Sequence, residues 1–157
     1  MLTNQQIRDV VQKYEDGEEN ILAILLKLQE ASGQNYISED CAVEVAKELN
    51  IPASKIYDLL TFHSMFSTKP RGKYIIEICK SAPCHVNKSR EIVKMFENEL
   101  GIKMGETTAD KLFTLQFTSC IGACDIAPAA KIGEKVYGNL TKEDVKKIIQ
   151  EYREGGK

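Results

Sequence analysis

The chain has 157 residues with a formal net charge of −2 at pH 7, and 43% of them are hydrophobic and 28% charged. This balance predicts a soluble, globular protein of one ordinary domain or two small ones. The longest apolar stretch, residues 21–26, is too short to cross a bilayer. The first residues lack the basic and apolar regions of a secretory signal, so we expect a cytoplasmic protein without direct membrane insertion.

Charge is unevenly distributed along the chain. Residues 1–62 have a net charge of −6 and residues 63–157 a net charge of +4. Such polarity either orients the protein against a partner or reflects two solvated surfaces. The basic residues are dispersed and lack an interleaved aromatic motif, so no nucleic-acid partner is expected.

Residues 1–68 have the pattern of a helical bundle. Apolar residues recur at helical spacing in four segments, 7–14, 21–28, 43–49 and 56–60. Ser38 is suited to cap the third helix, and Pro52 suits the first turn of the fourth. Short connections between short amphipathic helices predict a compact bundle as the first domain.

Residues 69–157 change to a mixed pattern and form the second expected domain. The sequence predicts strands at 74–79 and 112–118, a helix at 89–100 between them, a hairpin at 129–138 and a final helix. Thr141 can cap this last helix, and the side chain of Asp144 can in turn accept a hydrogen bond from the Thr141 amide. A crossover helix makes the first two strands parallel, so segments that follow their carboxyl ends converge at one edge of the sheet. The fold class is therefore α+β.

Four cysteines follow these two strands in two tight pairs, Cys79-x4-Cys84 and Cys120-x3-Cys124, while Cys41 lies far away. In a reducing cytoplasm clustered cysteines bind metal or do redox work more often than they form disulfides. The spacing favours an iron–sulfur cluster, in which each pair could serve one iron. Structural zinc is the second candidate, although zinc pairs usually have a two-residue spacing. A redox dithiol is the third, but its Cys-x-x-Cys motif is missing.

Residues next to the pairs fit a metal–sulfur site. Gly122 and Ala123 are small enough for backbone amides to approach sulfur. His85 beside Cys84 raises the alternative of histidine ligation, which would require a second histidine in the loops. Asp125 is expected to be a solvated loop residue, and Cys41 a buried, inert thiol. No residues are expected to be catalytic, so the chain has the character of an electron carrier.

The cysteine motif, with Ile121-Gly122-Ala123 inside the second pair and Ala127-Pro128 after it, resembles the thioredoxin-like [2Fe–2S] subunit of NADH dehydrogenase (complex I). The same family includes subunits of NAD(P)-linked and electron-bifurcating iron-only hydrogenases and of formate dehydrogenases. The segment 60–66 followed by 70–74 is similar to the family's junction between a helical part and a thioredoxin-like part. Family members often have Tyr where His63 stands.

The resemblance implies a thioredoxin-like [2Fe–2S] ferredoxin domain after the helical bundle. It implies that Cys79, Cys84, Cys120 and Cys124 bind one [2Fe–2S] cluster. It also implies a partner, an iron–sulfur flavoprotein subunit that carries FMN and the NAD(H) pocket, because this chain has no dinucleotide-binding fingerprint. A hydrogenase large subunit is a second candidate partner.

The expected function is therefore single-electron transfer within an NAD(P)-dependent oxidoreductase complex, without an independent active site in this chain. We favour a soluble hydrogenase, with or without electron bifurcation, slightly over complex I or formate dehydrogenase as the parent complex. Two alternatives remain open at this point: a free-standing thioredoxin-like ferredoxin, and a zinc-stabilised interaction module that does no redox chemistry.

Overall fold

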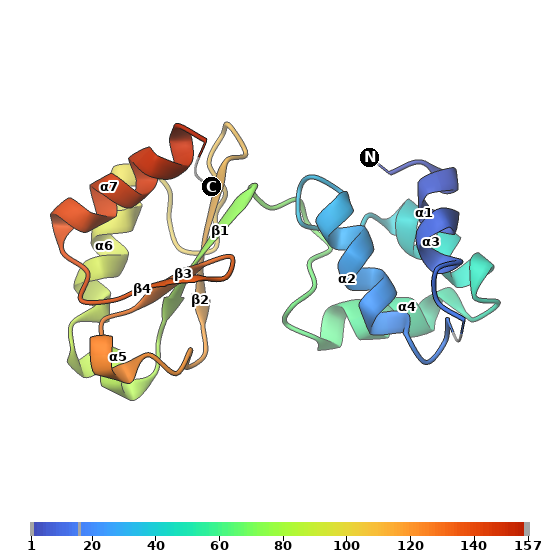
Figure 1. The fold of residues 1–157 in the computed structure, drawn as a ribbon, viewed down its shortest axis with the longest axis horizontal. Coiled ribbons are helices and arrows are strands. Elements are labelled where there is room, and N and C mark those ends of the chain that lie inside the picture. The colour runs from blue at the N-terminus through green and yellow to red at the C-terminus, as the bar shows by residue number, and fades with distance from the viewer. Residues whose placement is uncertain (1, 16, 156–157) are drawn as a thin grey trace. The chain divides into compact units, whose positions relative to one another are not determined.

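The computed structural model describes residues 2–15 and 17–155, and the chain divides into two compact units, Met1–Arg71 and Gly72–Lys157 (Figure 1). The first unit contains helices, and the second combines helices with a four-stranded sheet. The expected α+β class is thus confirmed. Within the described ranges no helix combines the length and the apolar character that crossing a membrane requires.

All four helices expected in the first unit are present. They are α1 (Asn4–Val11), α2 (Ile21–Ala31), α3 (Glu39–Glu48) and α4 (Ala53–Phe62). Ser38 caps α3 as expected, because its hydroxyl oxygen accepts a hydrogen bond from the Cys41 amide at 3.3 Å. Two details differ from expectation: α1 ends before Tyr14, and Pro52 occupies the N-cap of α4 instead of its first turn.

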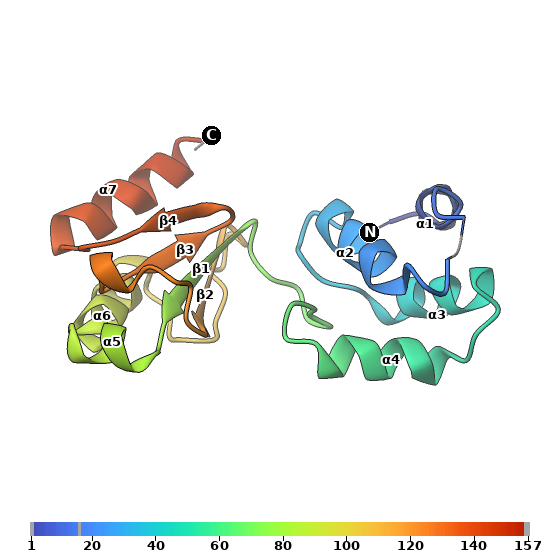
Figure 2. The same ribbon diagram turned by 60° about the horizontal axis from the view of Figure 1, so that its bottom comes forward.

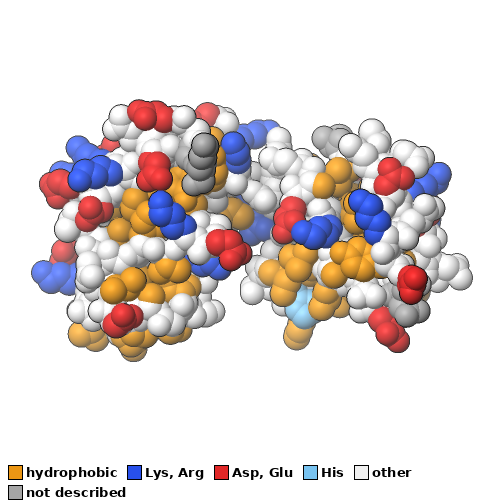
Figure 3. Space-filling model, in the orientation of Figure 1, with side chains coloured by type: hydrophobic (Ala, Val, Ile, Leu, Met, Phe, Trp, Pro, Cys, Tyr) orange, Lys and Arg blue, Asp and Glu red, His pale blue; other side chains and the backbone are white. Residues whose placement is uncertain are grey.

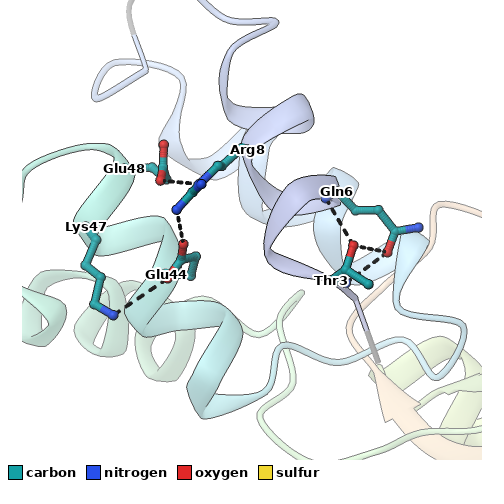
Figure 4. Close-up of polar contacts among 6 residues, drawn as sticks. All are labelled: Thr3, Gln6, Arg8, Glu44, Lys47 and Glu48. Atoms are coloured by element: carbon teal, nitrogen blue, oxygen red, sulfur yellow. Dashed lines mark hydrogen bonds and ion pairs between the residues drawn. The ribbon is translucent and has the colours of Figure 1, made fainter.

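Polar contacts fix the start of α1 and join it to α3. Figure 4 shows the reciprocal capping box between Thr3 and Gln6, which satisfies the free amides at the start of α1. Arg8 Nη2 lies 3.1 Å from Glu44 Oε1, and Arg8 Nε lies 2.8 Å from Glu48 Oε1. Because Arg8 is largely exposed, these ion pairs set the orientation of the two helices more than they stabilise them.

The helical unit encloses one hydrophobic core. Apolar residues at helical spacing from α2, α3 and α4 meet there, and the most completely buried are Ile24, Leu25, Leu28, Val45 and Ile56. This packing uses only one face of α3 and one of α4.

The second unit is built on a sheet with the strand order β2-β1-β3-β4. Its strands are β1 (Tyr74–Cys79), β2 (Phe113–Thr118), β3 (Ala130–Ile132) and β4 (Lys135–Tyr137). β1 and β2 are parallel, as the crossover helix predicts, and their register runs from Tyr74 opposite Phe113 to Cys79 opposite Thr118. β3 is antiparallel to both β1 and β4, which confirms the hairpin.

Helices cover one face of this sheet. They are α6 (Ser89–Leu100) and α7 (Lys142–Arg153), which lie next to each other on the same side of the strands (Figures 1 and 2). α6 is the predicted crossover helix, and α7 begins with the predicted capping box of Thr141 and Asp144. The core between the layers includes Ile76 and Phe113 of the strands and Phe96 of α6.

Two short elements at the end of the parallel strands are not predicted. They are α5 (Ala82–Val86), which follows β1, and the 3-10 turn η1 (Cys124–Ile126), which follows β2. Each contains one of the cysteines, so these elements set the positions of the thiols.

Candidate metal centre

The first cysteine pair is buried where β1 ends. Cys79 is the last residue of β1 and Cys84 lies in α5, and the two residues are only 1% and 2% exposed. They form a small apolar cluster with buried Ala129, and Ile121 and Ala123 pack against it. The loop that carries the second pair thus also forms the surroundings of the first.

Backbone groups of that loop are hydrogen-bonded to the first pair. The Cys79 amide donates to the carbonyl oxygen of Ala129 at 3.2 Å. The Ala129 amide acts to lower the pKa of Cys84, and the Ile121 amide acts to lower the pKa of Cys79. Backbone amides near sulfur stabilise negative charge there without adding a titratable group.

The two thiols of this pair differ in acidity. Burial raises the pKa of Cys79, but hydrogen bonds from the Ser81 amide, the Cys84 thiol and other donors outweigh it, so the pKa lies below its usual value. The pKa of Cys84 is raised, first by burial and further by the neighbouring Cys79. Cys79 is therefore the more acidic thiol of the pair, and a bound cation would favour ionisation of both.

The second pair lies at the surface. Cys120 follows β2 and Cys124 begins η1, and their sulfur atoms are 3.8 Å apart. The Gly122 amide donates to Cys120 Sγ at 3.4 Å from a left-handed backbone with φ +79°. Sulfurs of a disulfide are about 2.05 Å apart, so these thiols are free. Two thiolates that each lie about 2.3 Å from one tetrahedral ion are about 3.8 Å apart, which is the spacing seen here.

The two pairs converge at one end of the unit, where α5 lies beside η1 in both ribbon views (Figures 1 and 2). The packing of Ile121 and Ala123 against Cys79 and Cys84 also joins the two segments. In residues 2–15 and 17–155, no group of three or more Cys, His, Asp or Glu side chains is close enough together to hold a metal ion. The structure thus brings the two cysteine pairs to one end of the unit without gathering the four described thiols into one ligand set.

The other residues considered from the sequence lie outside the two pairs. His85 is exposed on α5 and Asp125 is exposed in η1, as expected for solvated residues. His63 follows α4 in the helical unit. Cys41 is buried in α3, and burial raises its pKa to about 11, in keeping with an inert thiol.

Sequence reasoning missed α5 and the backbone donors around the first pair. A signal for α5 was present, because Ser81 stands at its N-cap and Pro83 lies in its first turn, both common at helix starts. The donors at Ile121 and Ala129 have no such signal, because every residue except proline offers the same amide.

Known proteins share this sequence and fold. The family model for the thioredoxin-like [2Fe–2S] ferredoxin matches residues 7–153. A subunit of the NADH-quinone oxidoreductase of Rickettsia felis is 38% identical over 145 residues, which cover 92% of this chain and 87% of that protein. The HndA subunit of the NADP-reducing hydrogenase of Solidesulfovibrio fructosivorans is 35% identical over 148 residues, which cover 92% and 85%.

A solved structure has a similar fold. A chain in the crystal structure of air-oxidised NAD+-reducing [NiFe]-hydrogenase matches 83% of this chain with a TM-score of 0.71 and 21% identity. The present chain covers only 23% of that hydrogenase chain, and at this identity the likeness concerns the fold alone. The match over residues 7–153 confirms the resemblance seen in the cysteine motif. The chain therefore belongs to the thioredoxin-like [2Fe–2S] ferredoxin family, and this membership implies a [2Fe–2S] cluster as its cofactor.

Proposed function

We propose that this chain is an electron-transfer subunit in which Cys79, Cys84, Cys120 and Cys124 hold one [2Fe–2S] cluster. Family membership supports the cofactor. The ligand assignment depends on one observation, the convergence of a buried and an exposed thiol pair at the same end of the parallel strands. When bound, such a cluster supplies one-electron oxidation and reduction. In this proposal residues 69–157 are the electron-transfer domain and residues 1–68 an accessory bundle.

The residues around the thiols are suited to this role. The Gly122 amide donates to Cys120 Sγ, and the amides of Ile121 and Ala129 act to lower the pKa values of Cys79 and Cys84, so backbone amides offset negative charge at the sulfurs. The burial of Cys79 and Cys84 keeps water from one side of the site. The exposure of Cys120 and Cys124 leaves the other side open to a redox partner.

The partner that we propose is a flavoprotein subunit that binds FMN and NAD(H). The two bacterial relatives are subunits of an NADH-quinone oxidoreductase and of an NADP-reducing hydrogenase, both of which use a nicotinamide nucleotide. A flavin exchanges two electrons with such a nucleotide, whereas a cluster exchanges one, so this chain would hold single electrons.

The type of complex that contains this chain, hydrogenase or complex I, is a separate part of the proposal. Relatives of the quinone-reducing and hydrogenase types are 38% and 35% identical to this chain, so identity does not separate the two types. We retain the soluble hydrogenase as the working hypothesis and complex I as its alternative. Electron bifurcation has no support among these relatives, and we do not propose it.

Anaerobic purification of the full chain tests the cofactor. We expect iron and acid-labile sulfide in equal amounts, visible absorption, and a paramagnetic signal after reduction with dithionite. Zinc without sulfide or colour would instead identify the chain as a zinc-stabilised interaction module.

Co-purification tests the partner and the parent complex. A tagged chain expressed from its native genome should bring down a subunit that contains flavin. A hydrogen-activating metal subunit in the same complex identifies a hydrogenase, and membrane subunits identify complex I. Recovery of the holoprotein alone, after mild lysis, would favour a free-standing ferredoxin.

A further inference from the structure

The helical unit has an apolar groove between α3 and α4. A hollow of about 460 Å³ lies between the two helices, with buried Ile37 and Leu60 in its lining. A second hollow continues it past Ile51 and Pro52, and the two share Val43 and Ala53 in their linings. The groove therefore extends along the helix pair beyond a single pocket.

The residues that line this groove are spaced as in a helix-binding surface. On both helices they recur at intervals of three and four residues, so that each helix presents one continuous stripe. The stripes consist of Glu39, Ala42, Val43 and Ala46 on α3, and Ala53, Tyr57 and Leu60 on α4. Small alanines in both stripes allow a third helix to approach the backbone closely, with its ridges in the groove.

Large apolar side chains at the groove remain exposed. Tyr57 is 62% exposed and Val43 is 37% exposed. Figure 3 shows apolar side chains reaching the surface of the helical unit over α4. A contiguous apolar surface of this kind in a small unit marks a site for another protein.

Acidic side chains at the groove indicate the charge of the helix that can bind there. The carboxylate of Glu39 is in the lining of the first hollow, and Asp58 is adjacent to Tyr57. Neither carboxylate has a hydrogen-bond or ion-pair partner among the described residues.

The lysines of α3 and α4, by contrast, already have acidic partners. Lys47 is paired with Glu44 at 3.7 Å, and Lys55 is paired with Glu18. Residues 1–71 have a net charge of −4, from 11 acidic and 7 basic residues. The complementary partner is therefore basic.

We propose that the α3–α4 groove binds an amphipathic helix of another protein, whose apolar stripe is flanked by Lys or Arg. The apolar side chains of this helix would recur at positions i, i+3, i+4 and i+7 and occupy the two hollows. Its basic residues would pair with Glu39 and Asp58. This site is separate from the cysteine pairs, and its assignment does not depend on the proposed electron-transfer function.

Two designed peptides test the proposal on the full holoprotein. One is a fluorescein-labelled amphipathic helix of Leu, Ala and Lys, and the other has Glu in place of every Lys. We expect the Lys peptide to bind saturably with one site per chain and the Glu peptide to bind at least tenfold more weakly. Amide chemical-shift changes should map to α3 and α4. Equal binding of both peptides, no binding of the Lys peptide, or shifts outside these helices would overturn the proposal.

Matched variants locate the contact. Tyr57→Ser removes an exposed apolar wall and should weaken binding of the Lys peptide about tenfold, while Glu39→Gln should weaken it several-fold and reduce its dependence on salt. Val136→Ser and Glu134→Gln make the same kinds of change in the second unit and should leave the affinity within twofold. Unchanged affinity in both groove variants, or self-association of the free chain through this groove, contradicts the assignment. Thermal melts and cluster absorbance confirm that each variant is folded.

Discussion

The amide of Cys79 donates a hydrogen bond to the carbonyl oxygen of Ala129 at 3.2 Å. One buried alanine therefore joins the end of β1 to the loop that leaves η1, and it packs with Cys79 and with Cys84 of α5. Because this loop directly follows the segment with the second cysteine pair, the bond links the positions of the two pairs. Changes in either pair or in the loop should therefore alter the binding of the cluster.

Replacement of Cys120 should abolish cluster assembly, whereas replacement of Cys41 should not. Cys120→Ala removes one of the two exposed thiols that lie 3.8 Å apart, so one metal ion loses a ligand. Cys41→Ala removes a buried thiol from the other unit and is expected only to lower stability modestly. Iron and sulfide content per chain, with visible absorption, measures the difference. Equal loss of colour in both variants contradicts the ligand assignment.

Gly122→Ala should impair the cluster beyond its effect on stability. Gly122 has φ +79°, and an added Cβ meets no atom within 4 Å, so the substitution costs only backbone strain. That cost is about 1–2 kcal/mol for a left-handed residue. Relief of the strain would move the amide that donates to Cys120 Sγ at 3.4 Å. We expect faster loss of the cluster and a lower reduction potential, because a donor at sulfur stabilises the reduced state.

Gly133→Ala is the matched control for this prediction. Gly133 lies in the turn between β3 and β4 with φ +60°, and an added Cβ there also meets nothing within 4 Å. Both variants should lose a similar amount of stability in urea unfolding, but only Gly122→Ala should change the potential. If the reduction potential shifts by the same amount in both variants, general backbone strain and not the Gly122 amide causes the effect.

Much of this fold could be predicted from periodicity and helix caps. Residues 89–100 form the helix expected from their apolar spacing and from Gly101 after them, and the capping box at Thr141 starts α7. The predicted elements were wrong or missing where the sequence gives little local indication of a helix or of its end. Tyr14 continues the apolar spacing of α1, but the helix ends at Val11. A five-residue helix such as α5 is too short to show a period.

The site was predictable only in part. The topology of two parallel strands brings the segments after Cys79 and Thr118 to the same edge, which follows from the crossover rule. The contacts that hold the thiols are tertiary and involve backbone amides of Ile121 and Ala129. Side-chain type does not encode them, so sequence reasoning could name the cysteines without describing their environment.

Stability at low pH should depend on Asp110. The Thr108 hydroxyl donates to its carboxylate at 2.5 Å and the Leu112 amide donates to it at 2.9 Å, and these bonds hold the pKa of Asp110 below its usual value. A carboxylate with a depressed folded-state pKa contributes stability that is complete above its unfolded-state pKa. That contribution is lost as the pH falls through the folded-state value.

Asp110→Asn keeps an acceptor oxygen but removes the titration. We expect the metal-free variant to lose less stability than the wild type between about pH 5 and pH 2, as measured by urea unfolding at several pH values. Glu134→Gln, at an exposed turn, serves as the control and should follow the wild type. A pH profile of Asp110→Asn that superimposes on the wild type would refute this role.

Gly138→Ala should disturb the second cysteine pair from a distance in sequence. Gly138 passes directly against η1, and an added methyl group would lie within 2.5 Å of Ile126 Cβ. The next residue is also tied to η1, since the Asn139 amide donates to the Ile126 carbonyl oxygen at 2.6 Å. Overpacking of this kind costs roughly 1–3 kcal/mol. Because Cys124 begins η1, we expect both lower stability and lower cluster occupancy.

A double-mutant cycle separates this contact from other causes. Ile126→Ala removes the atoms beyond Cβ that the new methyl group meets, so the double variant should regain part of the stability and occupancy that Gly138→Ala loses. Ile126→Ala alone provides the reference for its own loss of packing. If the effects of the two substitutions simply add, or if Gly138→Ala is as stable as the wild type, the β4–α7 connection does not position the turn that carries Cys124.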